Sequence, residues 1–179
     1  MRKSLVLGLD GLPLARLRRQ RIELVDDPAQ AFLFGHGARS HRFGLLARTL
    51  LEKGANSRAT DRDGKSALLL AAENGLTSIV HLLLKKGTHP DQQDTFGNSA
   101  LILAAKHAHA PVVEALLKNG ADVHITNKSG DTAFLVSARS DTVAVMNILL
   151  QNGAHANEKT LTGTTALMMA AEKGRLDVV

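Results

Sequence analysis

The sequence predicts an all-α fold, a solenoid of helix pairs that stack on one another. Aromatic residues make up only 3% of the chain, with no Trp and no Tyr, so the core is built from Leu, Val, Ile and Ala. That composition favours helices over a β-sandwich or barrel. Glycines recur with a period of 33 residues in two independent series, which indicates repeated units. The series are Gly64, Gly97, Gly130 and Gly163, and Gly54, Gly87, Gly120 and Gly153.

Composition narrows the class of protein. The chain has 179 residues, of which 44% are hydrophobic and 22% charged, as is typical of a soluble folded protein. It contains no Cys, which excludes disulfides, thiolate zinc ligands and cysteine nucleophiles and favours an intracellular, cytoplasmic location. No apolar run approaches the roughly 20 residues that a membrane-spanning helix needs, so no membrane span is expected.

Basic residues concentrate at the N-terminal end. Residues 1–60 hold eleven Lys and Arg against five Asp and Glu, whereas residues 61–179 hold eleven against twelve. We expect residues 1–27 to form a basic segment, with a helix over about 14–25 that closes the stack. RLRRQR (16–21) is the candidate contact to nucleic acid. No aromatic platform accompanies it, which favours a solvated helix face, and nucleic acid is not the expected partner.

Residues 28–60 are expected to form a degenerate repeat that caps the array. Leu46, Leu50, Leu51 and Gly54 lie one period before the second-helix positions of the next unit. Other positions in this segment do not match the repeat. The segment is therefore predicted to end the stack rather than to continue it.

Residues 61–179 hold the clear repeats. In each unit a Ser or Thr follows the turn glycine by two positions and precedes Ala and a large apolar residue, which predicts a capped first helix. Small residues in that helix let neighbours approach closely, and a second helix ends in paired leucines and a glycine suited to a left-handed end. The caps are Ser66, Ser99, Thr132 and Thr165, and the leucine pairs are Leu83–Leu84, Leu116–Leu117 and Leu149–Leu150.

The unit DRDGKSALLLAAENGLTSIVHLLLKKG (61–87) resembles an ankyrin repeat. The resemblance covers about residues 28–179 and implies a turn, two antiparallel helices and a short connecting loop in every repeat. The Pro that usually follows the capping residue in this family is Ala in all four units. Because the Ser and Thr caps remain, we expect the stack to form. The family's usual His is replaced by Leu69, Ile102, Leu135 and Met168.

One turn departs from the family pattern. Between the two helices the family prefers glycine, and only two units have one. Because a Cβ disfavours the left-handed conformation, we expect strain or an altered turn at Ala108. The residues at this position are Gly75, Ala108, Asp141 and Gly174.

The C-terminal end predicts an incomplete unit. Val178 and Val179 align with Ile79 and Val80, so the leucine pair and closing glycine of the fourth unit do not follow. We expect three complete repeats and a truncated fourth within residues 61–179, as in a fragment of a longer array. The alternative is a truncated gene product.

The sequence holds no pattern typical of catalysis. It has no glycine-rich phosphate loop, and its eight histidines lack metal-ligand spacing. His107 and His109 are expected to point to different faces of a helix. His89 and His155 lie two repeats apart, too far to share a zinc ion. We predict a non-enzymatic protein without cofactor, metal or small-molecule substrate.

The resemblance implies a binding surface, because ankyrin-like stacks usually contact partners with their turn tips and the exposed side of the first helices. Phe96 and Leu161 are the large apolar residues on that surface, which makes Phe96 a candidate anchor. The alternative is that Phe96 folds back on its own turn. The predicted partner-binding residues are Arg62, Asp63, Lys65, Glu73, Asn74, Thr95, Phe96, Asn98, Lys106, His107, Lys128, Ser129, Asp131, Arg139, Ser140, Leu161, Thr162 and Thr164.

Two functional hypotheses stand beside the less favoured contact of the basic N-terminal helix with nucleic acid. The first is a non-catalytic module that docks another protein on a concave face centred on Phe96, Lys106, Lys128 and Arg139. The second is the targeting or regulatory arm of a longer enzyme or channel whose functional domain lies outside this chain. The identity of the partner is not encoded in the repeated positions.

Overall fold

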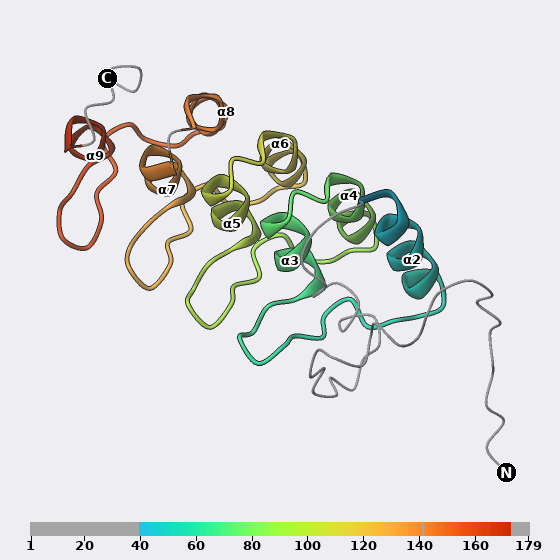
Figure 1. The fold of residues 1–179 in the computed structure, drawn as a ribbon. Helices are drawn as coiled ribbons and strands as arrows, with labels where there is room; N and C mark the ends of the chain where they lie inside the picture. Colours follow the sequence, from blue (N-terminus) through green and yellow to red (C-terminus); the bar gives the residue numbers. More distant parts are fainter. Residues whose placement is uncertain (1–39, 141, 173–179) are drawn as a thin grey trace, which may run out of the picture.

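The computed structural model describes residues 40–140 and 142–172 and confirms the all-α solenoid (Figure 1). Within these residues no extended strand forms, and the turns contain isolated bridges between Thr60 and Ser66, Gln93 and Ser99, and Lys159 and Thr165. The helices are α2 (Ser40–Glu52), α3 (Ala67–Glu73), α4 (Thr77–Lys85), α5 (Ala100–Lys106), α6 (Ala110–Lys118), α7 (Ala133–Ser140), α8 (Val143–Gln151) and α9 (Ala166–Glu172).

The helices lie in two rows. Figure 1 shows α3, α5, α7 and α9 as one row of first helices, with the long turns projecting from the same side of the stack. The second helices α4, α6 and α8 form the other row, and α2 packs against α4. This arrangement leaves the turn tips and one side of the first row free of the packing between the two rows.

Several expectations for the chain ends lie outside the described residues. These are the basic segment 1–27, the start of the 28–60 segment, and Gly174, Val178 and Val179 at the other end. Within α2, Ala47 is 6% exposed and belongs to the core. The capping role of residues 28–60 and the truncated fourth repeat both stay predictions.

Hydroxyl groups begin the first helices, as the sequence predicts. The Oγ of Ser66 accepts the backbone N–H of Leu69, and Ser99 does the same for Ile102 at 3.3 Å. Each cap satisfies one of the N–H groups that the first turn of a helix leaves unpaired. The hydroxyls of Thr132 and Thr165 accept from Leu135 and Met168 in the same way. The array therefore begins its helices without the family's proline.

Left-handed residues end the helices. Gly87, Gly120 and Gly153 have φ values of +80°, +82° and +99°, which confirms their expected role. Ala108 has φ +63° and is the one non-glycine residue with positive φ in the described part of the chain. This confirms the strain expected there. Its equivalent Gly75 has φ +68°, and a Cβ on it would lie 2.7 Å from the Nδ1 atom of His109.

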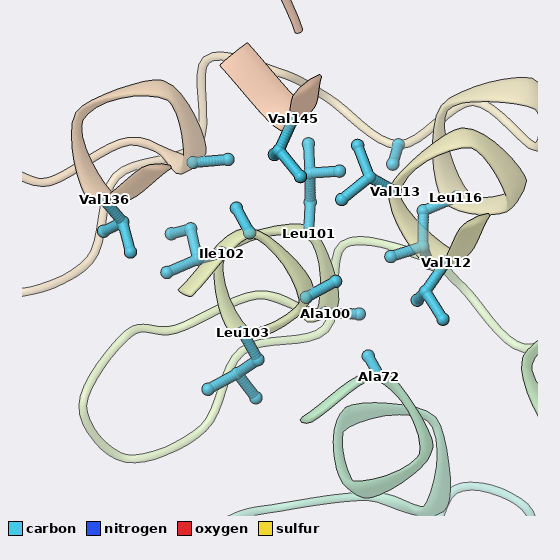
Figure 2. Packing of buried hydrophobic residues seen from close by; sticks show 14 of the residues in the cluster. Ala72, Ala100, Leu101, Ile102, Leu103, Val112, Val113, Leu116, Val136 and Val145 are labelled. Atoms are coloured by element: carbon cyan, nitrogen blue, oxygen red, sulfur yellow. The ribbon is translucent and has the colours of Figure 1, made fainter. Parts of the chain in front are cut away.

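A continuous apolar core runs between the rows. Figure 2 shows Leu101 and Ile102 of α5 next to Val113 of α6 and Val136 of α7. Small residues let the first helices approach, and Ala71, Ala72, Ala104, Ala105, Ser137 and Ala138 are all 0% exposed. The first leucine of each pair is also fully buried: Leu83, Leu116 and Leu149. The second leucine is less so, since Leu84 is 9% and Leu150 38% exposed.

The last described helix exposes apolar side chains. Leu167 and Met168 of α9 are 56% and 57% exposed, whereas Leu101 at the position equivalent to Leu167 is 2% exposed. Inside the array the next repeat covers this position, and no further helix is described beyond α9. None of the described helices is both long enough and apolar enough to cross a membrane.

Candidate partner-binding surface

Each turn is ordered by one polar side chain at its start. An oxygen of Asp61 accepts the backbone N–H groups of Asp63 and Lys65 at 2.9 and 2.7 Å. Asp94 and Asn127 hold their own turns by the same two bonds, to residues two and four positions later. This position is not among the features predicted from the sequence. The signal was present, because Asp and Asn favour such turns and recur here every 33 residues.

Successive turns are also bonded to one another. The backbone N–H and the hydroxyl of Thr95 both donate to the carbonyl of Asp63 at 2.9 Å, and the N–H of Lys128 donates to the carbonyl of Phe96 at 3.0 Å. Gly97 permits this approach, since a Cβ there would lie 2.9 Å from the Lys128 nitrogen. The tips of the first three turns therefore form one preordered edge.

Most of the predicted binding residues reach solvent. Those that the structure exposes are Arg62, Asp63, Asn74, Thr95, Phe96, Lys106, His107, Lys128, Ser129, Arg139, Leu161 and Thr162. Those that it partly buries are Lys65, Glu73, Asn98, Ser140 and Thr164. Asp131 is the exception, at 4% exposed.

The two apolar residues of the surface lie differently. Phe96 is 59% exposed, which favours the exposed-anchor interpretation over a ring folded back on its own turn. Leu161 is 78% exposed, but it also sits over the preceding turn. A Cβ on Gly130 would lie 2.5 Å from the Cγ atom of Leu161, so Gly130 provides the space for that side chain. Both residues leave large apolar area in water.

The expectation that Asp131 lies exposed is wrong. Its carboxylate accepts two hydrogen bonds from Arg139, at 2.9 Å from Nη1 and 3.1 Å from Nη2. This bonding raises the pKa of Arg139, with burial opposing the shift. The forked pair satisfies a buried carboxylate that would otherwise be costly. Asp131 therefore holds Arg139 in place instead of facing a partner.

The same two positions carry an inverted pair in the first repeat. Lys65 and Glu73 occupy the positions equivalent to Asp131 and Arg139, and the Lys65 Nζ atom lies 2.7 Å from a Glu73 oxygen. Both side chains are partly buried, with 19% of Lys65 and 27% of Glu73 exposed. Opposite charges eight residues apart in two repeats were the sequence signal for this contact.

The second repeat has a cation at this place but no acid. Lys106 is equivalent to Glu73, and the position of Lys65 is taken by Asn98. The Asn98 side chain donates to Asp94 at 3.0 Å and accepts from Asn127 at 3.1 Å, so it is engaged within the turns. Lys106 forms no ion pair with the described residues, and neither does Lys128.

The expectation that His107 and His109 face apart is wrong. Their rings stack with centroids 6.1 Å apart, because α5 ends at Lys106 and the chain turns at Ala108. The Nε2 atom of His109 donates to the carbonyl of Glu73 at 3.0 Å and so ties two repeats together. Partial burial lowers the pKa of His107, which Glu73 partly offsets.

A second histidine pair joins the third and fourth repeats. The rings of His124 and His155 stack 5.2 Å apart. Glu158 accepts the backbone N–H of His155 at 3.0 Å and a hydrogen bond from the hydroxyl of Thr132. This contact was not predicted, because the two histidines are 31 residues apart and so do not occupy the same position of the 33-residue repeat. The described residues contain no group of three His, Cys, Asp or Glu side chains arranged to hold a metal ion.

The chain is similar to a known family of repeat proteins. A family model described as ankyrin repeats in three copies matches residues 36–127 and 101–179. The two matches overlap, and together they cover every helix described above. A search of curated proteins finds no match.

Proposed function

Because the chain belongs to the ankyrin repeat family, we propose that it binds another protein through its turn tips and the adjoining face of its first helices. Ankyrin repeats are generally protein–protein interaction modules, typically without catalysis. The proposed activity of this chain is binding alone, with a protein and not a small molecule as the ligand.

The observation that carries the proposal is Phe96. Its side chain is 59% exposed, while its backbone is held from both sides. The N–H of Phe96 donates to Asp94 at 2.9 Å, and its carbonyl accepts from Lys128 at 3.0 Å. Folding gains little from a large apolar group at this place, whereas binding gains an aromatic anchor.

Preorganisation supports the same conclusion. The side-chain bonds within the turns and the backbone bonds between them order the surface before a partner arrives. Association then costs less conformational entropy than it would for mobile loops. A rigid edge of this kind favours recognition by shape and charge.

Site-specific photo-crosslinking tests the proposal. A photoreactive phenylalanine analogue replaces Phe96 or Ser129 in the full chain, and the same analogue replaces Asn147, an exposed residue of the second helix α8, as the matched control. In an extract of the source cells, we expect one protein adduct shared by positions 96 and 129 and missing at position 147. Adducts only at position 147, or equal yields at all three, would contradict the proposed surface.

Alanine variants give an independent check on the captured partner. Phe96→Ala combined with Lys128→Ala should weaken binding without changing the helical content, because neither side chain is in the core. Arg139 is unsuitable for this purpose, since removing it would leave the buried Asp131 without its forked partner. Unchanged affinity in the double variant would contradict the choice of surface.

A further inference from the structure

The exposed charges of the proposed surface have one sign in the second and third repeats. Among the predicted binding residues there, the exposed charged side chains are Lys106, Lys128 and Arg139. The acid of that set, Asp131, is buried and held by Arg139. Among the described residues of this face, the exposed acids lie at its two ends: Asp63 in the first repeat and Glu172 in the last described helix. The middle of the surface is therefore cationic.

Apolar groups flank this cationic middle. Lys128 follows Phe96 along the edge, and the two turns are joined by the bond from the Lys128 N–H to the Phe96 carbonyl. Leu161 lies on the next turn, over Gly130. We call Phe96, Lys106, Lys128 and Leu161 the cationic edge. On three successive turns it presents the apolar Phe96, the cation Lys128 and the apolar Leu161, while Lys106 lies at the end of α5.

We propose that the cationic edge binds an acidic, extended segment of the partner that carries a large apolar side chain. This inference rests on the proposed function and names its partner class. The partner's carboxylates pair with Lys106 and Lys128, and its apolar side chain packs on Phe96. Basic segments are excluded by repulsion from the two lysines, so the edge selects its partner as well as holding it.

The spacing of the repeats sets the length of the segment. Neighbouring packed helices lie about 8–10 Å apart, and an extended chain advances about 3.3 Å per residue. The path from Phe96 over Lys128 to Leu161 crosses two such intervals. A segment of about six residues spans it, with contacts on successive turns about three residues apart.

A protein segment fits this edge better than a nucleic acid does. Nucleic-acid binding draws on many phosphate contacts and on stacked aromatic platforms. Here Phe96 is the single Phe, Tyr or Trp of the predicted surface. The apolar Leu161 would gain nothing from contact with a phosphate chain. Two apolar groups together with a few cations match a peptide that carries both acidic and apolar side chains.

Peptide selection tests the inference. A phage-displayed library of random peptides is selected on the full chain, and the enriched sequences are tested against three variants. We expect enriched peptides to combine Asp or Glu with a large apolar residue. Lys106→Glu with Lys128→Glu, and separately Phe96→Ala, should each weaken their binding at least about tenfold. Lys53→Glu with Lys85→Glu is the matched control, since it makes the same charge change at exposed lysines away from the first-helix face.

The outcomes separate this inference from the proposed function. Enriched peptides that are basic or uncharged, yet still lose binding in the cationic-edge variants, would overturn the partner chemistry and leave the surface standing. Peptides bound equally by all variants, or no enrichment at all, would overturn the proposed function as well. Competition with a random-sequence oligonucleotide tests the other class of partner. If the oligonucleotide displaces the peptides at a concentration below the one at which the peptides themselves bind, the edge prefers nucleic acid, and the inference is overturned.

Discussion

Arg139 holds the buried carboxylate of Asp131 with two parallel hydrogen bonds, in the reverse charge order of the Lys65–Glu73 pair two repeats earlier. The first and third repeats thus each bridge the turn to the end of the first helix, but with the acid at opposite ends of the bridge. The buried Asp131 therefore holds the exposed guanidinium of Arg139 at a fixed place on the surface.

Removing Arg139 should destabilise the fold. Arg139→Ala leaves the Asp131 carboxylate buried without its forked partner, and we expect the free energy of unfolding to fall by about 1–2 kcal/mol. The loss stays at this level because the Arg139 side chain is 48% exposed, so water reaches the pair. Urea denaturation measures it. Combining Asp131→Asn with Arg139→Ala also removes the buried charge. The double variant should therefore lose less unfolding free energy than Arg139→Ala alone. Equal losses would contradict the role given to the pair.

The strained turn at Ala108 should be relieved by glycine. Ala108→Gly removes a Cβ from a residue with φ +63°, and we expect a gain of about 1 kcal/mol in the free energy of unfolding. Gly75→Ala is the inverse control. It should lose stability from its positive φ and from the approach of a Cβ to the His109 ring. A destabilised Ala108→Gly variant would show that the turn is not strained.

The buried hydroxyl of Thr88 is another place where a substitution should stabilise the fold. Thr88 is 4% exposed, and its Oγ1 atom has no hydrogen-bond partner in the described part of the chain. The equivalent residues of the other repeats are alanines: Ala55, Ala121 and Ala154. Thr88→Ala should therefore raise the free energy of unfolding by about 1 kcal/mol, as read from thermal or urea unfolding. Ala154→Thr should have the opposite sign, and a loss on Thr88→Ala would contradict this assignment.

The lowered pKa of His107 gives the fold a pH dependence. Burial disfavours the charged ring, Glu73 partly offsets this, and Lys106 adds to it. The unfolded chain therefore binds a proton at a higher pH than the folded chain does. The contribution of His107 to the free energy of unfolding falls as pH drops from about 6.5 and levels off below the folded pKa.

A variant isolates this contribution. The difference in unfolding free energy between the native chain and His107→Asn is measured at about pH 7.5 and again at about pH 5. We expect the native chain to lose stability relative to the variant at the lower pH. The remaining histidines are common to both chains, so their titration largely cancels. A pH-independent difference would contradict the shift assigned to His107.

The periodic positions could be predicted from the sequence. Helix starts at Ser66 and Ser99, left-handed ends at Gly87 and Gly120, and the strain at Ala108 each follow from the local chemistry of one residue in a known register. The repeat supplies that register, and each position then has the same neighbours in every unit.

Contacts that break the period could not be predicted in this way. His124 and His155 meet although they are out of register, and Asp131 is buried although most of its surface neighbours are exposed. The histidine contact and the burial of Asp131 both depend on which side chains pair with each other. Aligning equivalent positions of the repeats one at a time does not show such pairs. Leu150 differs from Leu84 for a related reason, since its exposure depends on what packs beyond α8.

The most direct test of the binding surface is a nuclear magnetic resonance titration. The ¹⁵N-labelled chain is titrated with the tightest peptide from the selection, and amide shifts are followed along the described residues. We expect the largest shifts at the turn tips of residues 95–98 and 127–129 and at the end of α5, with small shifts in α4, α6 and α8. Shifts centred on the second helices or on the exposed face of α9 would contradict it.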